Sequence, residues 1–315
     1  MRAVFILIVV VLNKLKLNGA AIVENFKCGF IVLVGPANAG KSTLLNQLAG
    51  SKLSIVTPKP QTTRQNIMVM KNTETYQAIF LDTPGYIAPE YQLQKFMVSS
   101  SLTAIRQSAD VIAFITDEGP DNKINLELVQ KIQQTDIPSV LIINKIDKIP
   151  PLKVARMEEE YKKIHNFREV FKISALNGTG VRNFLNRIVT YLPEHEPFYP
   201  KDQWTDRWER FYAAEFIREQ IFHLYKEEIP YSCAVTIEEF KERETNNFIK
   251  ANLYVERKSQ KPIIIGKGAK AIKQLRENAQ KEIEKFSGKK TILQIEVKVS
   301  PNWRNNAGAI KKLGL

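Results

Sequence analysis

The chain has 315 residues, of which 44% are hydrophobic, a length and composition that predict two domains, each with its own buried core. Its two cysteines, Cys28 and Cys233, lie far apart, which excludes a disulfide framework and a cysteine metal site and fits a reducing compartment. The net charge is +13, and residues 251–315 alone hold 15 Lys and Arg against 5 Asp and Glu, which predicts a polyanionic partner, either nucleic acid or an anionic membrane surface.

Residues 1–26 form an N-terminal extension of uncertain status. Residues 3–12 are ten uninterrupted apolar residues behind Arg2. This run is too short to span a bilayer but is similar to the core of a signal peptide. The rival explanations are a translation start placed too far upstream, and an extra strand or helix packed on the first domain. We leave the segment out of the functional argument.

The stretch 35–42, Gly-Pro-Ala-Asn-Ala-Gly-Lys-Ser, lies between a predicted buried strand at 30–34 and a predicted helix at 43–49. Strand, Gly-rich loop and helix predict a phosphate-binding P-loop rather than a chance match in a βα turn. Backbone N–H groups and the helix N-terminus then face a polyphosphate, Lys41 reaches the outer phosphates, and the Ser42 hydroxyl binds Mg²⁺. The nucleotide-binding residues expected here are Gly35, Pro36, Ala37, Asn38, Ala39, Gly40, Lys41, Ser42 and Thr43.

Two further segments complete the predicted phosphate side. Residues 52–64 read as a loop, and Thr63 in it is expected to bind Mg²⁺ when a γ-phosphate holds the loop inward. The strand at 78–81 ends in Asp82, Thr83, Pro84 and Gly85, a sequence that an ordinary turn would also explain. In a P-loop protein, Asp82 holds Mg²⁺ through water and the Gly85 N–H meets the γ-phosphate. The predicted metal ligands are Ser42, Thr63 and Asp82.

The predicted strand at 140–143 ends in Asn144, Lys145 and Asp147. A carboxylate only accepts hydrogen bonds, so Asp147 suits the two adjacent donors of guanine, which adenine lacks. This motif argues against the alternative of an ATP-dependent metabolic kinase. Ser174 and Ala175, after a strand at 170–173, are expected to close over the base. All these loops follow strands, at the edge where α/β sheets bind ligands.

Residues 27–193 resemble the G domain of small GTPases: α/β, with a mostly parallel sheet and helices on both faces. Three prolines among residues 192–200 predict a linker, which we place at 194–203. Residues 204–315 predict a smaller α+β domain. It has helical spacing at 211–225, alternating strands at 233–237, 248–255 and 292–299, and a basic helix that ends near residue 286.

An Ile run at 263–265, then Gly266, Lys267, Gly268 and Ala269, then the basic helix, resembles a KH domain. The usual loop is Gly-x-x-Gly, so Ala269 departs from the pattern, and tight approach of an RNA backbone is in doubt there. The expected RNA contacts are Ile265, Gly266, Lys267, Gly268, Ala269, Lys270 and Lys273. The alternative is a solvated basic helix with no RNA role.

A G domain followed by a KH-like domain resembles the Era family of ribosome-assembly GTPases. The resemblance is carried by residues 60–64, 82–85, 212–215, 228–232 and 313–314. It implies GTP and GDP binding, GTP hydrolysis and contact with the 3′ end of 16S ribosomal RNA in assembly of the 30S subunit. It also implies a cytoplasmic location with loose peripheral attachment to the inner membrane, and no obligate oligomer. The alternative is a membrane-surface GTPase whose basic region meets anionic lipid.

Hydrolysis is expected to be slow, because Tyr86 stands where Ras-like enzymes place a glutamine that orients water. Asn38 matches the asparagine that helps related GTPases hold K⁺ against the phosphates. The predicted catalytic set is therefore Lys41, Asn38, Thr63 and Gly85, with Mg²⁺ and K⁺ as cofactors. The γ-phosphate would hold Thr63 and Gly85 inward, and hydrolysis would release both loops.

Overall fold

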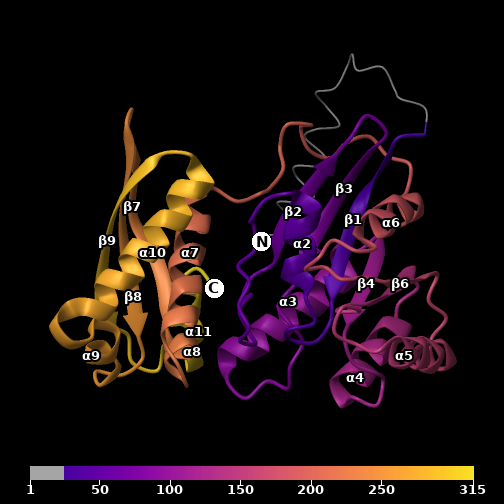
Figure 1. Cartoon of the computed structure of the whole chain (residues 1–315), viewed down its shortest axis with the longest axis horizontal. Helices are drawn as coiled ribbons and strands as arrows, with labels where there is room; N and C mark the ends of the chain where they lie inside the picture. Colours follow the sequence, from indigo (N-terminus) through magenta and orange to yellow (C-terminus); the bar gives the residue numbers. More distant parts are fainter. Residues whose placement is uncertain (1–24) are drawn as a thin grey trace.

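The computed structural model describes residues 25–315, and it places two domains side by side (Figure 1). The predictions for the extension therefore lie outside the described residues, apart from Asn25 and Phe26. The N-terminal domain is built on a six-stranded sheet with the order β2-β3-β1-β4-β5-β6. Its strands are β1 (Lys27–Val34), β2 (Ile67–Asn72), β3 (Tyr76–Asp82), β4 (Val111–Thr116), β5 (Ser139–Ile143) and β6 (Val170–Lys172).

Alternate residues of β1 point into two separate cores, which explains the layers of this domain. Ile31 and Leu33 pack on one face with α2 (Lys41–Ala49) and α6 (Val181–Ile188). Val32 and Val34 pack on the other face with α3 (Gln92–Ser108), α4 (Lys123–Gln133) and α5 (Pro151–Ile164). All strand pairs are parallel except β2–β3, so the predicted fold class is confirmed. The antiparallel edge strand β2 was not predicted from the sequence.

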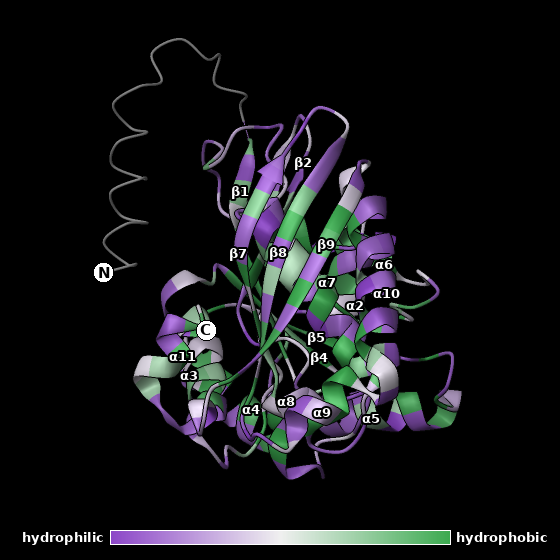
Figure 2. Cartoon of the chain, turned by 90° about the vertical axis from the view of Figure 1, so that its left-hand side faces the viewer, coloured by the Kyte–Doolittle hydropathy of each residue, from purple (hydrophilic) through white to green (hydrophobic). Residues whose placement is uncertain are grey.

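The C-terminal domain is α+β. Its sheet has the order β7-β8-β9, with β7–β8 antiparallel and β8–β9 parallel. Figure 2 shows hydrophilic and hydrophobic residues alternating along these strands, with α7 and α10 behind them. The elements are α7 (Glu209–Leu224), α8 (Ile229–Ser232), β7 (Ala234–Glu242), β8 (Asn246–Val255), α9 (Gln260–Ile265), α10 (Lys270–Ser287), β9 (Lys290–Val299) and α11 (Ala307–Lys312), with short 3₁₀ helices η1 (Val189–Tyr191) after α6, η2 (Lys267–Ala269) before α10 and η3 (Trp303–Asn305) before α11.

The segment predicted as a linker is fixed to the N-terminal domain by several contacts, and the buried side chain of Gln77 makes three of them. The Gln77 Oε1 accepts hydrogen bonds from the N–H groups of Phe198 and Tyr199, at 2.8 and 3.0 Å. Its Nε2 donates to the Tyr199 carbonyl at 2.8 Å. The linker thus runs against β3 although its composition is typical of a free connection.

Residues after β9, for which the sequence predicted no helix, join the two domains. Trp303 is fully buried, and its Nε1 donates to the Ser232 carbonyl at 2.9 Å. Leu93 and Met97 of α3 pack in the same apolar cluster as Trp303 and Ile310. In residues 25–315, none of the helices has the length and apolar content needed to cross a bilayer.

Candidate nucleotide site and nucleic-acid surface

A cavity of about 510 Å³ opens where β1, β3 and β5 end. It gathers motifs that are far apart in the chain, as expected for the carboxyl edge of a parallel sheet. The predicted residues that line it are Ala37, Asn38, Gly40, Lys41, Ser42, Thr43, Thr63, Gly85, Asn144, Lys145, Asp147 and Ala175. The other predicted nucleotide-site residues, Gly35, Pro36, Ala39, Asp82, Thr83, Pro84 and Ser174, lie outside this lining. Eight residues that were not predicted as site residues also line the cavity: Ile55, Val56, Thr57, Pro58, Gln61, Thr62, Lys148 and Leu176. Of these, Gln61 and Thr62 lie in the stretch 60–64 that carries the family resemblance, and the other six have no motif signal.

Lys41 lies inside the P-loop, where it bonds to the loop's own backbone. Its Nζ donates to the carbonyls of Gly35 and Pro36 at 3.1 and 2.8 Å, and the side chain is buried. Burial lowers the pKa of Lys41 to about 8, while Asp82 and Asp117 act in the opposite direction. A phosphate in this loop would restore the charged ammonium, so the site favours an anion.

Three oxygen-bearing side chains meet beside Lys41. The Ser42 Oγ donates to Asp82 Oδ2 at 2.7 Å and lies 3.0 Å from the Thr63 Oγ1. Ser54, which the sequence did not single out, also donates to Asp82 Oδ2, at 2.9 Å. Asp82 is fully buried, and its Oδ1 has no partner among the described residues. Burial raises the pKa of Asp82, an effect that the charge of Lys41 opposes.

This donor set fits Mg²⁺, a hard cation that takes oxygen ligands and retains water. The unpartnered Oδ1 of Asp82 is the observation that supports the fit. Within residues 25–315, no three His, Cys, Asp or Glu side chains converge on a metal-sized space. The hydroxyls of Ser42 and Thr63, water and phosphate would therefore supply most ligands, as predicted for a P-loop site.

Asn144 joins the phosphate loop to the base loop. Its Nδ2 donates to the Ala39 carbonyl at 2.8 Å, and its Oδ1 accepts from the Ala175 N–H at 2.9 Å. Gly40 makes this approach possible, because a Cβ there would lie 2.1 Å from the Asn144 Nδ2. The predicted role of Asn144 was contact with nucleotide. The structure gives it a bridging position between two walls of the cavity.

The base side of the cavity presents an ionised carboxylate. Asp147 is exposed, and a hydrogen bond from Ser174 holds its pKa below the usual range. Lys145, beside it, pairs with Asp117 at 2.6 Å. An acceptor-only group at the rim is what guanine recognition requires.

Gly85 sits against the P-loop, and Tyr86 does not face the cavity. A Cβ on Gly85 would lie 2.6 Å from the Ala37 Cα. The Tyr86 N–H donates to the Gly35 carbonyl at 3.0 Å, and its ring packs in the apolar core under α3 and α4. The side chain after Gly85 is therefore absent from the lining of the phosphate region, which agrees with the expectation that Tyr86 does not orient water.

The loop 52–64, named the switch loop here, is bound to the C-terminal domain. Lys59 donates through its Nζ to the Phe222 carbonyl at 2.6 Å and to the Tyr225 carbonyl, at the C-terminal end of α7. Arg64 donates to the Cys233 carbonyl at 2.7 Å and to the carbonyls of α8 residues. Two cations of the switch loop, Lys59 and Arg64, thus cap two helices of the other domain.

A third cation of the switch loop contacts the same helix. The Lys52 Nζ pairs with Glu219 of α7 at 2.6 Å, and Glu219 also accepts from the Val56 N–H at 3.2 Å. Glu219 is only 2% exposed, so the pair is shielded on the side of α7. The sequence predicted none of the switch-loop contacts. The backbone carbonyls that accept from Lys59 and Arg64 leave no mark in a sequence, and the Lys52–Glu219 pair depends on how the two domains pack.

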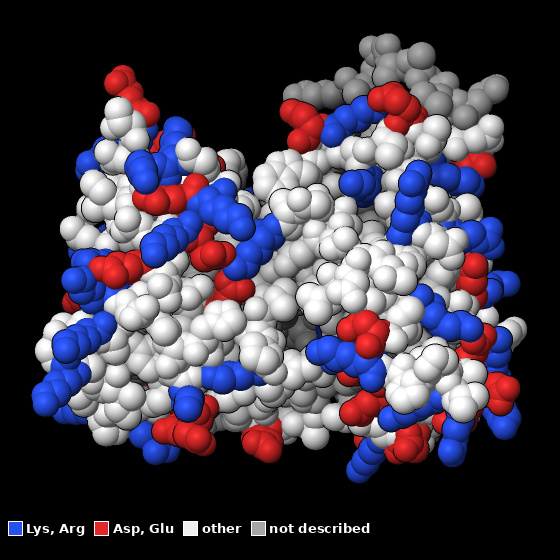
Figure 3. All heavy atoms as spheres, in the orientation of Figure 1, with Lys and Arg blue, Asp and Glu red and all other residues white. Residues whose placement is uncertain are grey.

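The KH loop, residues 266–269, is exposed at the N-terminus of α10. Gly266, Gly268 and Ala269 have φ of 72°, 59° and 59°, so the alanine adopts a left-handed conformation that normally favours glycine. Lys267 and Lys270 are exposed and form no ion pair in the described part of the chain. Figure 3 shows other Lys and Arg side chains on this face interspersed with acidic ones.

Comparisons with known proteins agree with both halves of this description. A family model for a 50S ribosome-binding GTPase matches residues 30–145, and a KH domain model matches residues 228–304. GTPase Era of Elusimicrobium minutum (strain Pei191) is 47% identical over 293 residues, which cover 92% of this chain and 98% of that protein. The chain belongs to the Era family of GTPases.

One further relative and two solved Era structures show the same similarity in sequence and in three-dimensional structure. GTPase Era of Carboxydothermus hydrogenoformans is 41% identical over 92% of this chain and 98% of that protein. A variant of Aquifex aeolicus Era bound to GDP·AlF4⁻ matches with a TM-score of 0.88 and 38% identity, over 92% of this chain and 99% of that one. An Era in complex with MgGDPNP and nucleotides 1506–1542 of 16S ribosomal RNA matches with the same TM-score, 0.88, and 39% identity, over 92% and 99%.

Membership of the Era family confirms the predicted fold class and the predicted order of a GTPase domain before a KH domain. The boundaries at 27–193, 194–203 and 204–315, and the individual site residues, stay predictions. The geometry supports most of the nucleotide set by bringing it to one cavity.

Proposed function

We propose that this chain is a GTP-hydrolysing switch that binds small-subunit ribosomal RNA through its KH domain and acts in assembly of the 30S subunit. The observation that carries the proposal is the bridge of Asn144 between the P-loop and the base loop, at 2.8 and 2.9 Å. It sets a polyphosphate cradle beside the Asp147 carboxylate in one cavity. An Era protein has been seen with MgGDPNP and 16S ribosomal RNA together, which supports both ligands.

In this mechanism the chain mainly positions and neutralises the phosphates. Lys41 lies in the loop that would cradle the β- and γ-phosphates, and the Gly85 N–H is expected to meet the γ-phosphate. Ser42, Thr63 and Asp82, the last through water, would hold Mg²⁺, which neutralises developing charge on the phosphates. Turnover is expected to be slow, since Tyr86 is packed away from the cavity.

Asn38 is proposed to help bind K⁺. It lines the cavity, and its Nδ2 donates to the Pro58 carbonyl of the switch loop at 3.1 Å, which leaves its amide oxygen as a ligand. Turnover in KCl should exceed turnover in NaCl, and Asn38→Ala should remove the difference. Equal rates in both salts for the parent protein would reject a role for K⁺.

The nucleotide state is proposed to reach the KH domain through the switch loop. Thr63 is next to Arg64, which is 6% exposed and bonded to carbonyls on α8 and beside it. Release of Thr63 after hydrolysis would therefore disturb the caps on α7 and α8. RNA affinity should differ between GDP and a non-hydrolysable GTP analogue. Lys59→Met should shrink the difference, and Lys153→Met, on exposed α5, should leave it intact.

Calorimetry with GDP, GTP and Mg²⁺ tests the nucleotide proposal. Asp147→Asn should weaken guanine nucleotide binding by about 100-fold and favour xanthine nucleotides, since an amide donates to the second carbonyl of xanthine. Asp136→Asn makes the same substitution elsewhere on the exposed surface, and it should change neither the affinity for guanine nucleotides nor the base preference. If the parent protein binds neither GDP nor GTP, the proposal fails.

A role on the ribosomal subunit would place the chain in the cytoplasm. Peripheral attachment to the inner membrane, and the alternative of a membrane-surface GTPase, are separable by co-sedimentation. We expect the chain to sediment with 30S subunits in preference to anionic liposomes at matched salt. Sedimentation with liposomes alone would favour the alternative. Steep salt dependence would not discriminate between them, because both partners are polyanions.

A further inference from the structure

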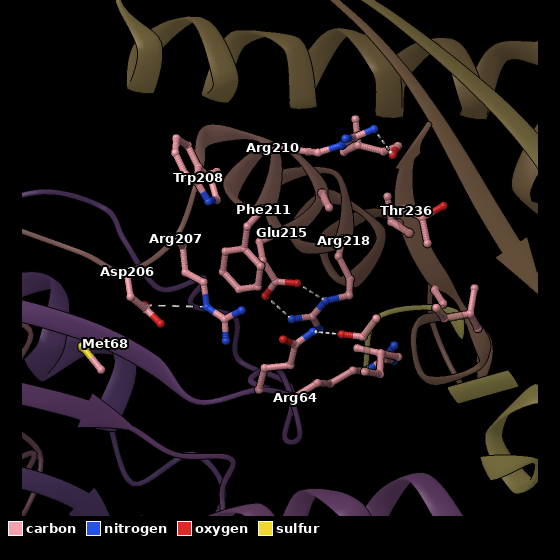
Figure 4. Close-up of a pocket in the computed structure, with 18 of the residues that line it drawn as sticks. Arg64, Met68, Asp206, Arg207, Trp208, Arg210, Phe211, Glu215, Arg218 and Thr236 are labelled. Carbon is pink, nitrogen blue, oxygen red and sulfur yellow. Dashed lines mark hydrogen bonds and ion pairs between the residues drawn. The ribbon is translucent and has the colours of Figure 1, made fainter. Parts of the chain in front are cut away.

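A second, larger cavity lies between the two domains, away from the nucleotide site. Its volume is about 1070 Å³, and its walls come from the end of the switch loop, β2, the linker (195–199), the residues before α7, α7 itself, β7 and the residues after α11. Figure 4 shows Arg207, Trp208, Phe211, Glu215 and Arg218 around it. No residue that lines the nucleotide cavity and no residue of the KH loop lines this second cavity. The switch loop contributes Arg64, its last residue, and Gln65 follows directly after it.

The floor of the cavity carries two buried guanidinium groups and one carboxylate. Arg64 and Arg218 are 6% and 2% exposed. Glu215 pairs with Arg218 through two hydrogen bonds, at 2.8 and 2.5 Å. Among the described residues, Arg64 donates only to backbone carbonyls. Buried charges are normally compensated one for one, so this floor holds one positive charge in excess.

One atom of this floor lacks the partner that burial demands. The Arg218 Nη1 is buried and has no hydrogen-bond partner within residues 25–315. Burial lowers the pKa of Arg64 to about 10, and the positive charge of Arg218 acts in the same direction. Both observations indicate that an anion on Arg218 would be stabilised, because guanidinium forks bind carboxylate and phosphate strongly.

The rest of the cavity has an apolar wall and a rim of mixed charge, in which Arg207, Arg210 and Lys312 stand against Glu196 and Asp206. Phe211, Ala214, Val235, Ile237 and Leu313 line the wall. The guanidinium of Arg207 lies 4.7 Å from the centre of the Phe211 ring, and Trp208 is 85% exposed beside it. An apolar cavity with a few convergent charged groups is typical of a small-molecule site.

We propose that this interdomain cavity binds a small amphipathic anion, whose carboxylate, sulfonate or phosphate pairs with Arg218 and whose apolar body lies on Phe211 and the neighbouring wall. The apolar body is either an acyl chain or a planar ring system. The proposal stands independently of the proposed function, since none of its residues binds the guanine nucleotide.

The test uses two fluorescent probes that differ in one group, with the nucleotide site saturated by GDP. Anilinonaphthalene sulfonate is the anion, and phenylnaphthylamine is the same ring system without the sulfonate. The full chain should bind one equivalent of the sulfonate, about tenfold more tightly than the neutral probe. Arg218→Met should abolish that preference, while Arg168→Met, an exposed arginine elsewhere, should preserve it.

Arg218→Met leaves Glu215 without its partner and could unfold the protein. A second variant keeps the proposal testable in that case. Ala214→Trp fills the cavity and leaves the ion pair in place, so it should abolish binding of the sulfonate without lowering the melting temperature. Displacement of the probe by dodecanoate would identify the body as an acyl chain, and displacement by adenosine monophosphate would identify a planar ring. Equal binding of both probes, or unchanged binding in Ala214→Trp, would overturn the proposal.

Discussion

Two loops of this chain place lysines and small residues before a helix, yet they are built in opposite ways. In the P-loop, Lys41 is 5% exposed and bonded to carbonyls of its own loop, and Asn144 braces the loop from a distant strand. In the KH loop, Lys267 and Lys270 extend into water. A site for one small ligand of fixed shape is assembled by buried contacts, whereas a surface for a long polyanion retains hydrated charges that release counterions on binding.

The largest expected effect comes from adding one methyl group to each loop. Gly40 has φ +99°, and a Cβ there would lie 2.1 Å from the Asn144 Nδ2. Gly40→Ala should therefore weaken GDP binding by at least about 100-fold, or about 3 kcal/mol, measured by calorimetry. Gly268 has φ +59° with no atom within 4 Å of the added carbon. Gly268→Ala should leave GDP binding unchanged and lose about 1 kcal/mol of stability. Similar GDP affinities for the two variants would break the comparison.

The next effect concerns the exposed lysines. The double variant Lys267→Met and Lys270→Met should weaken binding of an RNA with the 16S 3′-end sequence by about tenfold, and should reduce the slope of log affinity against log salt by about 1.4. Lys153→Met with Lys163→Met removes the same charge from exposed α5 and is the control. Equal losses in the two double variants would mean that net charge, rather than the KH loop, decides RNA binding.

A smaller effect distinguishes the buried lysine by its pH dependence. Burial lowers the pKa of Lys41 to about 8, so the free protein loses this charge as pH rises through about 8, while bound phosphate favours the charged form. Nucleotide binding then takes up a proton, and affinity should fall about fourfold between about pH 7 and about pH 8.5. Calorimetry in two buffers with different ionisation enthalpies would detect the proton that is taken up on nucleotide binding. Lys41→Arg stays charged, and its residual affinity should not show this fall.

The smallest effect tests the strain at Ala269, whose φ is 59°. Ala269→Gly should stabilise the chain by about 0.5–1 kcal/mol in denaturant unfolding, because glycine adopts this conformation without the steric cost of a Cβ. Ala271→Gly, two residues later in the first turn of α10, should destabilise it by up to about 1 kcal/mol, because glycine is a poorer helix former than alanine. If the two substitutions change stability in the same direction, the alanine is not strained.

Local patterns predicted the motifs of this protein because their physics acts over a few residues. Each motif depends on a few consecutive residues. Examples are the glycine conformations of the P-loop, the dipole of the helix that follows it and the acceptor-only chemistry of Asp147. Apolar runs likewise predicted five strands of the first sheet, at 30–34, 78–81, 111–115, 140–143 and 170–173. They missed β2 (Ile67–Asn72), an edge strand whose neighbour in the sheet is β3 and which has a short, mixed pattern.

By itself, the sequence therefore determined the order of the two domains, the chemistry of the nucleotide loops and the basic character of the KH region. The tertiary structure alone decided how these parts meet. Lys59 and its Phe222 partner are 163 positions apart, and Arg64 reaches carbonyls on and next to α8. Backbone carbonyls are the same for every residue type, so no pattern of side chains announces such contacts. The excess buried charge at Arg64 and Arg218 likewise exists only once the domains are packed together.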